Sequence, residues 1–183
     1  MSLPVVGKAH EAGAASAPFR WFIYGSSLDA SAFAVWAEQH GYRVPDFGAA
    51  VAAALPDHRL AFDVPSKFWG GPVATVTAAP GHAVEGIALP MPADARGLVD
   101  HKEGAISGLF EAFPAEVKPL EGGAALPVLV YRAAPSRRLP AEAAPSPGFL
   151  DALIAGARAH HLSAAWIAGL EAARTPSATG RQG

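Results

Sequence analysis

A run of titratable side chains before a glycine is the part of this sequence best suited to proton transfer. Val99-Asp100-His101-Lys102-Glu103-Gly104 contains two carboxylates, an imidazole and an ammonium group. A carboxylate at a pocket wall can move protons near neutral pH if burial raises its pKa. The same run is also typical of a solvated helix end followed by a C-cap glycine. On the residues alone, the helix end is the favoured interpretation.

A second candidate is the segment Tyr24-Gly25-Ser26-Ser27-Leu28, which lies between an expected strand and an expected helix. Backbone N–H groups at such a junction bind anions, and the helix dipole adds to the attraction. Gly25 lets a ligand come close to the main chain. The alternative is a capped turn between two core elements, and on spacing alone that alternative is favoured.

Two weaker signals lie further along the chain. Ala144–Leu150 is typical of a rigid loop that begins a helix, with Ser146 near the N-cap. The four tryptophans are more typical of a core than of a ligand platform. Trp69 is the exception of interest, because it lies in a turn that can border a pocket.

Other chemistries lack their motifs. His160 and His161 are adjacent, so on a helix they point about 100° apart and cannot easily share a metal; we expect both on the surface. Asp100, His101 and Glu103 lack the usual metal-ligand spacing. The chain has no cysteine, and it has neither a nucleophile elbow nor a glycine-rich nucleotide loop. The residues therefore indicate neither a metal site nor a nucleotide-binding loop.

The element pattern predicts runs of strands with few crossover helices between them. Expected strands are Phe19–Tyr24, His58–Val64, Val73–Ala78, Ala83–Leu89 and Leu126–Ala133, with a turn at Pro80-Gly81; expected helices are Asp29–His40, Asp94–Glu103, Gly148–Ala159 and Ser163–Ala172. Few crossover helices separate the strands, which predicts an α+β fold: a small mixed, mostly antiparallel, barrel-like sheet flanked by helices. We expect one domain over residues 19–173, a loose arm at 1–18 and a loose tail at 174–183.

The net charge and the distribution of apolar residues limit the kinds of partner that the chain is expected to bind. The net charge of −2 gives no basic footprint for nucleic acid. No apolar run approaches the roughly 20 residues that span a bilayer, and the first residues lack the apolar core of a signal peptide. We expect a soluble, cytoplasmic protein that binds a small molecule. The oligomeric state stays open, with a homodimer as one alternative.

Taken in order, these segments resemble the γ-glutamylcyclotransferase family, including its AIG2-like members. The family's Tyr-Gly-Ser-Asn-Leu loop corresponds to Tyr24–Leu28, and its Leu-Asp-x-x-Glu-Gly segment to Val99–Gly104. A Trp-x-Gly-x-x-Ala-Thr stretch is matched from Trp69 to Thr75. A Ser-Pro-x-Tyr segment leading to Gly-Ala is echoed by Ser146–Phe149 and Gly156-Ala157.

The resemblance implies cleavage of a γ-glutamyl amide by ring closure, with no metal and no organic cofactor. In that reaction the substrate's own α-amine attacks its γ-carbonyl, which gives 5-oxoproline and a free amine. The family's general acid/base corresponds to Glu103, and the loop Gly25–Leu28 would hold the substrate's α-carboxylate. Tyr24, Trp69 and Phe149 would complete the binding site.

This chain departs from the family pattern at two positions. Ser27 stands where the family has Asn, and Phe149 stands where it has Tyr. Losing a polar contact changes which ligand a site holds. A non-catalytic binding protein on the same fold therefore stays an alternative, as does an amide-cleaving enzyme with a non-glutamyl substrate.

Overall fold

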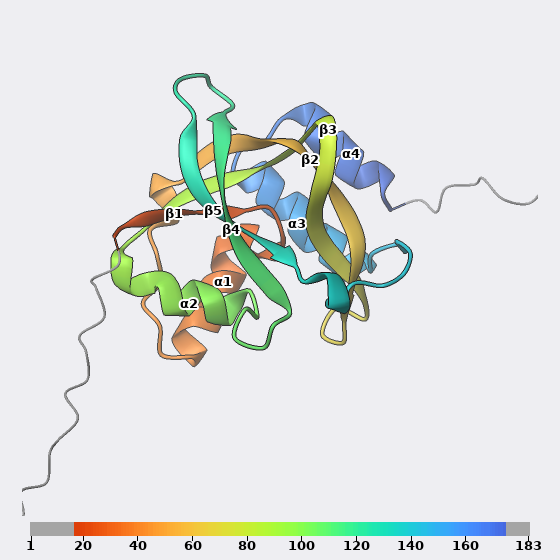
Figure 1. Cartoon of the computed structure of the whole chain (residues 1–183), viewed down its shortest axis with the longest axis horizontal. Coiled ribbons are helices and arrows are strands. Elements are labelled where there is room, and N and C mark those ends of the chain that lie inside the picture. The colour runs from red at the N-terminus through yellow and green to blue at the C-terminus, as the bar shows by residue number, and fades with distance from the viewer. Residues whose placement is uncertain (1–16, 175–183) are drawn as a thin grey trace, which may run out of the picture.

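The strands of the chain close into a barrel (Figure 1). The computed structural model describes residues 17–174. The strands are β1 (Phe19–Ile23), β2 (Val51–Ser66), β3 (Gly71–Met91), β4 (Phe110–Pro119) and β5 (Leu126–Ala133), in the barrel order β1-β3-β2-β4-β5. All pairs are antiparallel except the parallel pair β1–β5. The expected α+β class with a mixed, mostly antiparallel, barrel-like sheet is confirmed.

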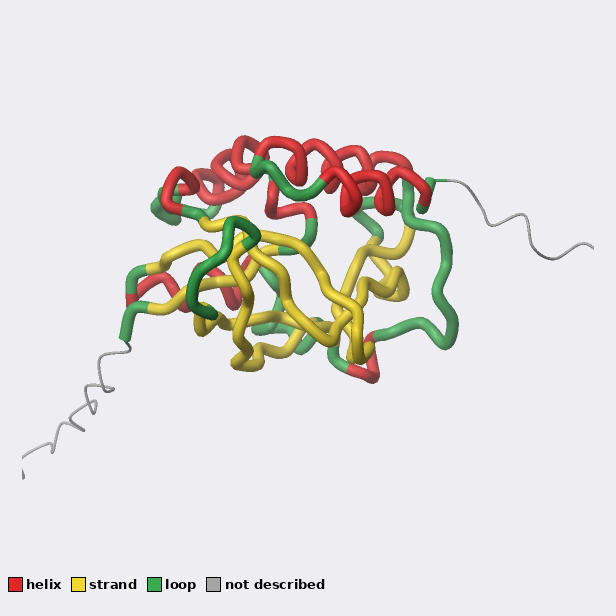
Figure 2. Tube along the Cα trace, turned by 90° about the horizontal axis from the view of Figure 1, so that it is seen from above, coloured by secondary structure: helices red, strands yellow, loops and turns green. Residues whose placement is uncertain are grey.

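Helices cover the barrel mainly from one side, as the view from above shows (Figure 2). The α-helices are α1 (Ala30–Gln39), α2 (Arg96–Lys102), α3 (Pro147–Ala159) and α4 (Ala164–Ala172). Short 3₁₀ turns occur at Ser26–Leu28 (η1), Phe47–Ala49 (η2), Ala93–Ala95 (η3) and Pro135–Arg137 (η4). No helix within residues 17–174 is long and apolar enough to cross a membrane.

Helix ends follow the local sequence closely. The Asp29 carboxylate caps α1 by accepting hydrogen bonds from the N–H groups of Ser31 and Ala32. Gly41 follows the C-cap of α1 with a φ of 71°, as expected for a C′ glycine. The Ser146 side chain caps α3 by accepting from the N–H of Phe149. These ends were predictable because each depends only on neighbouring residues.

The long hairpin of β2 and β3 corrects one expectation. Val73–Ala78 and Ala83–Leu89 are not separate strands with a turn at Pro80-Gly81, because β3 runs unbroken from Gly71 to Met91. The register slips opposite Asp57, whose carboxylate accepts from the N–H of Gly81 at 2.9 Å. Gly81 has a φ of 80°, so proline and glycine produce an irregularity within the strand and not a chain reversal.

Two strand segments were missed by the sequence reading. The first half of β2 is rich in alanine, which favours helices by propensity. It forms a strand because Val51–Pro56 pairs with Ala83–Ala88 of β3. The other missed segment is β4, where Pro114 interrupts the strand pattern but pairs with Leu129 of β5. Both depend on partners far along the chain.

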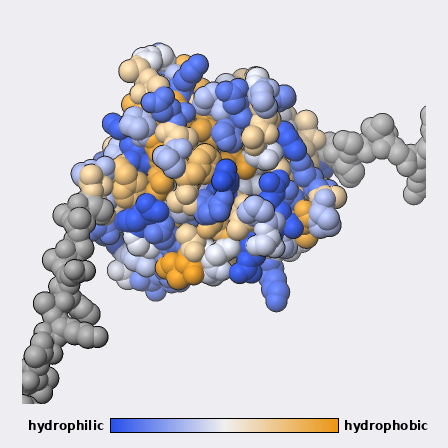
Figure 3. All heavy atoms as spheres, viewed as in Figure 1, coloured by the Kyte–Doolittle hydropathy of each residue, from blue (hydrophilic) through white to orange (hydrophobic). Residues whose placement is uncertain are grey.

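The core fills the barrel and the space beneath the helices. Trp21, Phe22 and Ile23 of β1 are all almost fully buried, because β1 is covered on both of its faces. The Trp21 ring lies 5.8 Å from the ring of Phe33 on α1, measured between centroids. On the outer face drawn in Figure 3, hydrophilic residues are interspersed among apolar ones.

The expected arm at 1–18 and tail at 174–183 lie almost wholly outside the described residues. Only Ala17, Pro18 and Arg174 of these segments are described. The regular elements between them begin with β1 at Phe19 and end with α4 at Ala172.

Helix α3 lies unusually close to the turn η1. A Cβ atom added at Gly156 would stand 2.4 Å from Cβ of Leu28 and 2.9 Å from its carbonyl carbon. Real atoms do not approach so closely, so only glycine allows this contact between α3 and the turn. The Gly-Ala pair noted in the sequence thus has a packing reason.

We predict that Gly156→Ala destabilises the fold by about 1–3 kcal/mol, because the added methyl group overpacks the α3–η1 contact. Gly169→Ala is the matched control. It also replaces a helical glycine, but its Cβ would meet nothing within 4 Å, so it should be neutral or stabilising by up to about 1 kcal/mol. Chemical denaturation measures both. Equal stability of the two variants would refute the close-packing explanation.

Candidate functional site

A cavity of about 410 Å³ collects segments that are far apart in the sequence. It is lined by the end of β1 with its following loop, the β2–β3 turn, the end of α2, the start of β4 and the start of α3. Of the predicted site residues it includes Tyr24, Gly25, Ser26, Ser27, Trp69, Glu103 and Phe149. Two larger hollows, of about 660 and 650 Å³, include none of them. Convergence of the predicted residues identifies the smaller cavity as the candidate site.

Leu28 is the predicted residue that does not line the cavity. Its side chain is fully buried and packs against Gly156. Its N–H donates to the carbonyl oxygen of Gly25 at 3.0 Å. Its own carbonyl oxygen lies 3.0 Å from Nε2 of His160, and because a carbonyl only accepts, that nitrogen carries the proton. Leu28 thus holds the loop against α3. His160 is partly buried, whereas His161 is exposed.

Glu103 reaches the cavity because helix α2 ends there. It is the C-cap residue, and Gly104 follows with a φ of 71°. The N–H of Gly104 donates to His101 O, and the N–H of Ala105 donates to Asp100 O. This is the Schellman pattern of a helix end. The helix-end interpretation of the motif and the chemical one are therefore both compatible with the same geometry.

The electrostatics of Glu103 suit proton transfer near neutral pH. Burial raises the pKa of the Glu103 carboxyl to about 7, and the nearby Lys102 ammonium partly offsets that rise. Lys102 and Glu103 are the charged side chains among the residues that line the cavity. A carboxyl with this pKa can both accept and donate a proton at pH 7.

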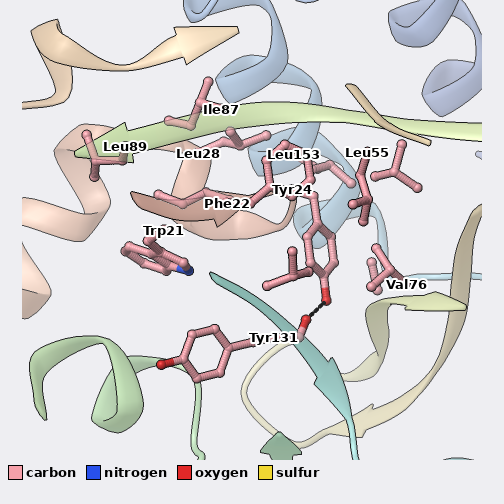
Figure 4. Close-up of a cluster of buried hydrophobic side chains, with 14 of the residues drawn as sticks. Trp21, Phe22, Tyr24, Leu28, Leu55, Val76, Ile87, Leu89, Tyr131 and Leu153 are labelled. Atoms are coloured by element: carbon pink, nitrogen blue, oxygen red, sulfur yellow. Dashed lines mark hydrogen bonds between the residues drawn. The ribbon is translucent and has the colours of Figure 1, made fainter. Parts of the chain in front are cut away.

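Tyr24 fixes the inner end of the loop. Its hydroxyl donates a 2.5 Å hydrogen bond to the carbonyl oxygen of Tyr131 on β5 (Figure 4). Burial and the charge of Glu103 raise the pKa of Tyr24 above its usual range, so the phenol stays protonated. With its proton engaged by a carbonyl, Tyr24 positions the loop and does not act as an acid.

Asp100 connects α2 to the barrel. Its Oδ1 accepts from the Tyr131 hydroxyl at 2.5 Å and from Nε of Arg96 at 2.9 Å. The Asp of the motif therefore holds the helix that carries Glu103 against the strand that Tyr24 also contacts. This role was not assigned from the sequence, because the partner Tyr131 lies on β5, far along the chain.

Trp69 and Phe149 form an apolar wall. Their rings make an edge-to-face contact with centroids 5.5 Å apart, and Phe149 is almost fully buried. A Cβ on Gly71 would lie 3.2 Å from the backbone nitrogen of Ser146, so this glycine lets the hairpin approach the start of α3. The wall thus joins β2–β3 to α3.

The loop after β1 leaves backbone donors available. Leu28 and Asp29 donate their N–H groups within the turn η1, to Gly25 O and Ser26 O. Within residues 17–174, the N–H groups of Ser26 and Ser27 have no acceptor, although Ser27 is buried. Buried N–H groups are nearly always paired, so these two are suited to a ligand's anionic group. A Cβ on Gly25 would meet nothing within 4 Å, so this glycine provides space.

Some lining residues were missed by sequence reasoning. Lys102, Trp36 and Phe68 also line the cavity. Lys102 was not singled out in the sequence, although it is adjacent to Glu103 in the same motif; both residues lie at the end of α2 and line the cavity. In the part of the chain that the structure describes, no cluster of three or more His, Asp or Glu could hold a metal ion.

Comparisons with known proteins agree with this fold. The model of the AIG2-like family matches residues 83–170, a stretch that includes Glu103 and Phe149. A solved structure of a γ-glutamyl cyclotransferase is 24% identical with a TM-score of 0.71, and the match covers 90% of this chain and 92% of that one. An uncharacterized protein from Homo sapiens is also 24% identical, with a TM-score of 0.72 and the same coverage.

More distant similarity extends to a glutathione-specific γ-glutamyl cyclotransferase from yeast. It is 12% identical with a TM-score of 0.61, and the match covers 86% of this chain and 96% of that one. No curated protein sequence matches this chain. At sequence identities this low, the structural similarity demonstrates a shared fold. The chain therefore has the γ-glutamyl cyclotransferase-like fold, and its residues 83–170 match the AIG2-like family.

Proposed function

We propose that this protein is an enzyme that releases an amine or amino acid from a γ-glutamyl amide by cyclisation to 5-oxoproline. The observation that carries the proposal is the position of Glu103, whose pKa is about 7, on the same cavity as the Tyr24–Ser27 loop. The shared fold with a γ-glutamyl cyclotransferase supports the reaction class. Substrate and product are small molecules, and the reaction needs no cofactor.

The chemistry is a transfer within one molecule. The substrate's α-nitrogen forms a bond to the γ-carbonyl carbon, and the bond from that carbon to the leaving nitrogen breaks. Both protons that the α-ammonium loses are gained by the leaving amine, so no water is consumed. Glu103 would carry these protons in turn. Ring closure between groups held in place reaches effective molarities of about 10⁵ M or more, which reduces what the protein must supply.

The loop would hold the glutamyl end of the substrate. The N–H groups of Ser26 and Ser27 suit the α-carboxylate, because backbone donors bind anions without steric bulk. This would direct the α-amine and γ-carbonyl towards Glu103. The apolar wall of Trp69 and Phe149 would exclude water and favour ring closure over hydrolysis.

The alternative is a binding protein, or an amide-cleaving enzyme with a non-glutamyl substrate. It is motivated by Ser27 and Phe149, which provide neither an amide nor a hydroxyl where the family pattern has Asn and Tyr. Binding of γ-glutamyl compounds without ring product would favour the binder. A linear acid as the product would favour the other enzyme.

Glu103→Gln should lower the rate of 5-oxoproline formation by about 10²–10⁴-fold, the usual contribution of a general acid/base. A panel of γ-glutamyl amino acids and γ-glutamyl amines, assayed for 5-oxoproline, measures this. Glu116→Gln is the control, because Glu116 is an exposed carboxylate on β4, and it should retain full activity. Full activity in Glu103→Gln would remove Glu103 from the mechanism.

The pH profile should report the raised pKa of Glu103. Accepting a proton requires the ionised carboxylate, so kcat/KM should rise with pH through a midpoint near pH 7, matching a pKa of about 7. The profile of kcat/KM reflects the free enzyme. A midpoint near 4.5, the ordinary value of a glutamate, would contradict the buried environment described for this group.

Gly25→Ala tests the loop. The residue has a φ of −108°, which alanine adopts easily, so the fold should keep its stability. The new methyl group would occupy space beside the Ser26 and Ser27 donors. Losing one hydrogen bond to a charged group costs about 1.5–3 kcal/mol, so KM should rise by about tenfold or more. An unchanged KM in steady-state kinetics would place the substrate away from the loop.

A further inference from the structure

Lys102 is the cation at the cavity wall, and the mechanism above does not use it. Among the residues that line the cavity, Lys102 alone carries a positive charge and Glu103 alone a negative one. The other lysines of the described chain, Lys67 and Lys118, are exposed. A partly buried ammonium group beside a reacting carboxyl requires its own explanation.

Aromatic rings hold the Lys102 side chain in place. Its Nζ lies 4.7 Å from the ring centroid of Trp36 and 5.6 Å from that of Phe33. Both rings belong to α1, and Phe33 is almost fully buried. Cations over tryptophan faces are stabilised by the ring quadrupole. The ammonium group thus lies against these rings at the cavity wall.

Among residues 17–174, no carboxylate forms an ion pair with this ammonium group. Six arginines, by contrast, form ion pairs with carboxylates: Arg59, Arg96, Arg132, Arg138, Arg158 and Arg174. Within residues 17–174, Lys102 has neither an ion pair nor a hydrogen bond to any acceptor. Its pKa lies below the usual range because burial disfavours the charge, which Glu103 partly offsets. A desolvated cation without an anion is costly unless a ligand supplies one.

The covalent structure of a γ-glutamyl amino acid suggests which group of the ligand supplies this anion. Glu103 must reach both the attacking and the leaving nitrogen, and each nitrogen is two bonds from a carboxylate carbon. The loop donors of Ser26 and Ser27 suit the carboxylate on the attacking side. Lys102, next to Glu103 in the chain, is then the group available for an anion on the leaving side.

We propose that the Lys102 ammonium binds an acidic group carried by the leaving amine and thereby selects γ-glutamyl amino acids over uncharged γ-glutamyl amines. This inference rests on the proposed function and adds a specificity-determining residue to it. The aromatic face of Trp36 keeps the ammonium at the cavity wall, and the leaving carboxylate completes its ion pair. Glu103 then lies beside the nitrogen that receives the proton.

The test compares two substrates that differ in one carboxylate, γ-glutamyl-L-alanine and γ-glutamyl-ethylamine. The wild-type protein should prefer the alanine compound. Lys102→Met should lower kcat/KM for that compound by about tenfold to a hundredfold, mainly through KM, as expected for a lost hydrogen bond to a charged group. The ethylamine compound should be little affected, and Lys102→Arg should restore part of the preference.

The ratio of the two substrates separates this role from an effect on Glu103. Any change in the pKa of Glu103 acts on both substrates and cancels in the ratio. Lys67→Met is the control, because Lys67 is an exposed lysine on the β2–β3 turn and its loss should leave the ratio unchanged. Thermal melting checks folding, and Lys102→Gln replaces the Met variant if that variant is unstable.

Outcomes distinguish this inference from the proposed function. Ring product from both substrates, with a ratio that Lys102→Met leaves unchanged, overturns the role of Lys102 and leaves the reaction intact. An equal fall for both substrates also overturns it, since Lys102 would then serve the glutamyl end or Glu103. No ring product from either substrate in the wild type overturns the proposed function itself. As a measurement free of mutation, L-alanine should inhibit the wild type more strongly than ethylamine.

Discussion

The seam between β1 and β5 is the constraint on which the candidate site depends. These strands pair in parallel, with Trp21 opposite Leu129, and their pairing closes the barrel. Just beyond the seam, the Tyr24 hydroxyl bonds to the Tyr131 backbone and the Tyr131 hydroxyl bonds to Asp100. The loop after β1 and helix α2, at whose end Glu103 lies, are thus both held against β5.

The electrostatics of the cavity depend on how few charged groups line it. Its walls are largely aromatic and aliphatic, and its charged groups are Lys102 and Glu103. Low polarity disfavours the ionised carboxylate and brings its pKa near 7. The same environment strengthens any attraction between the ammonium and a ligand anion. One physical cause, removal from water, therefore raises the pKa of Glu103 and lowers that of Lys102.

The sequence was most informative where structure is local. Asp29, Gly41 and Ser146 end or begin helices as their types predict, because capping involves only a few neighbouring residues. The order of the motifs also predicted that Glu103 and the Tyr24–Ser27 loop belong to one site, and both line the same cavity. What could not be predicted depends on distant partners. The alanine-rich start of β2 is a strand only through β3.

The same limit applied to the site. Leu28 belongs to the matched loop, yet it faces Gly156 of α3 and not the cavity. Lys102 lies next to Glu103 at the end of α2 and also lines the cavity, which residue spacing does not reveal.

The division of the cavity between the barrel and a hairpin turn bears on how such proteins diversify. Glu103 and the Tyr24–Ser27 loop are attached to the closed barrel and its helices. One outer wall instead comes from the turn between β2 and β3, where Phe68 is 86% exposed and Trp69 contacts Phe149. Turns accept insertions and substitutions far more readily than closed sheets. Changes to a few hairpin residues would therefore reshape one wall of the cavity while the positions of Glu103 and the Tyr24–Ser27 loop stay the same.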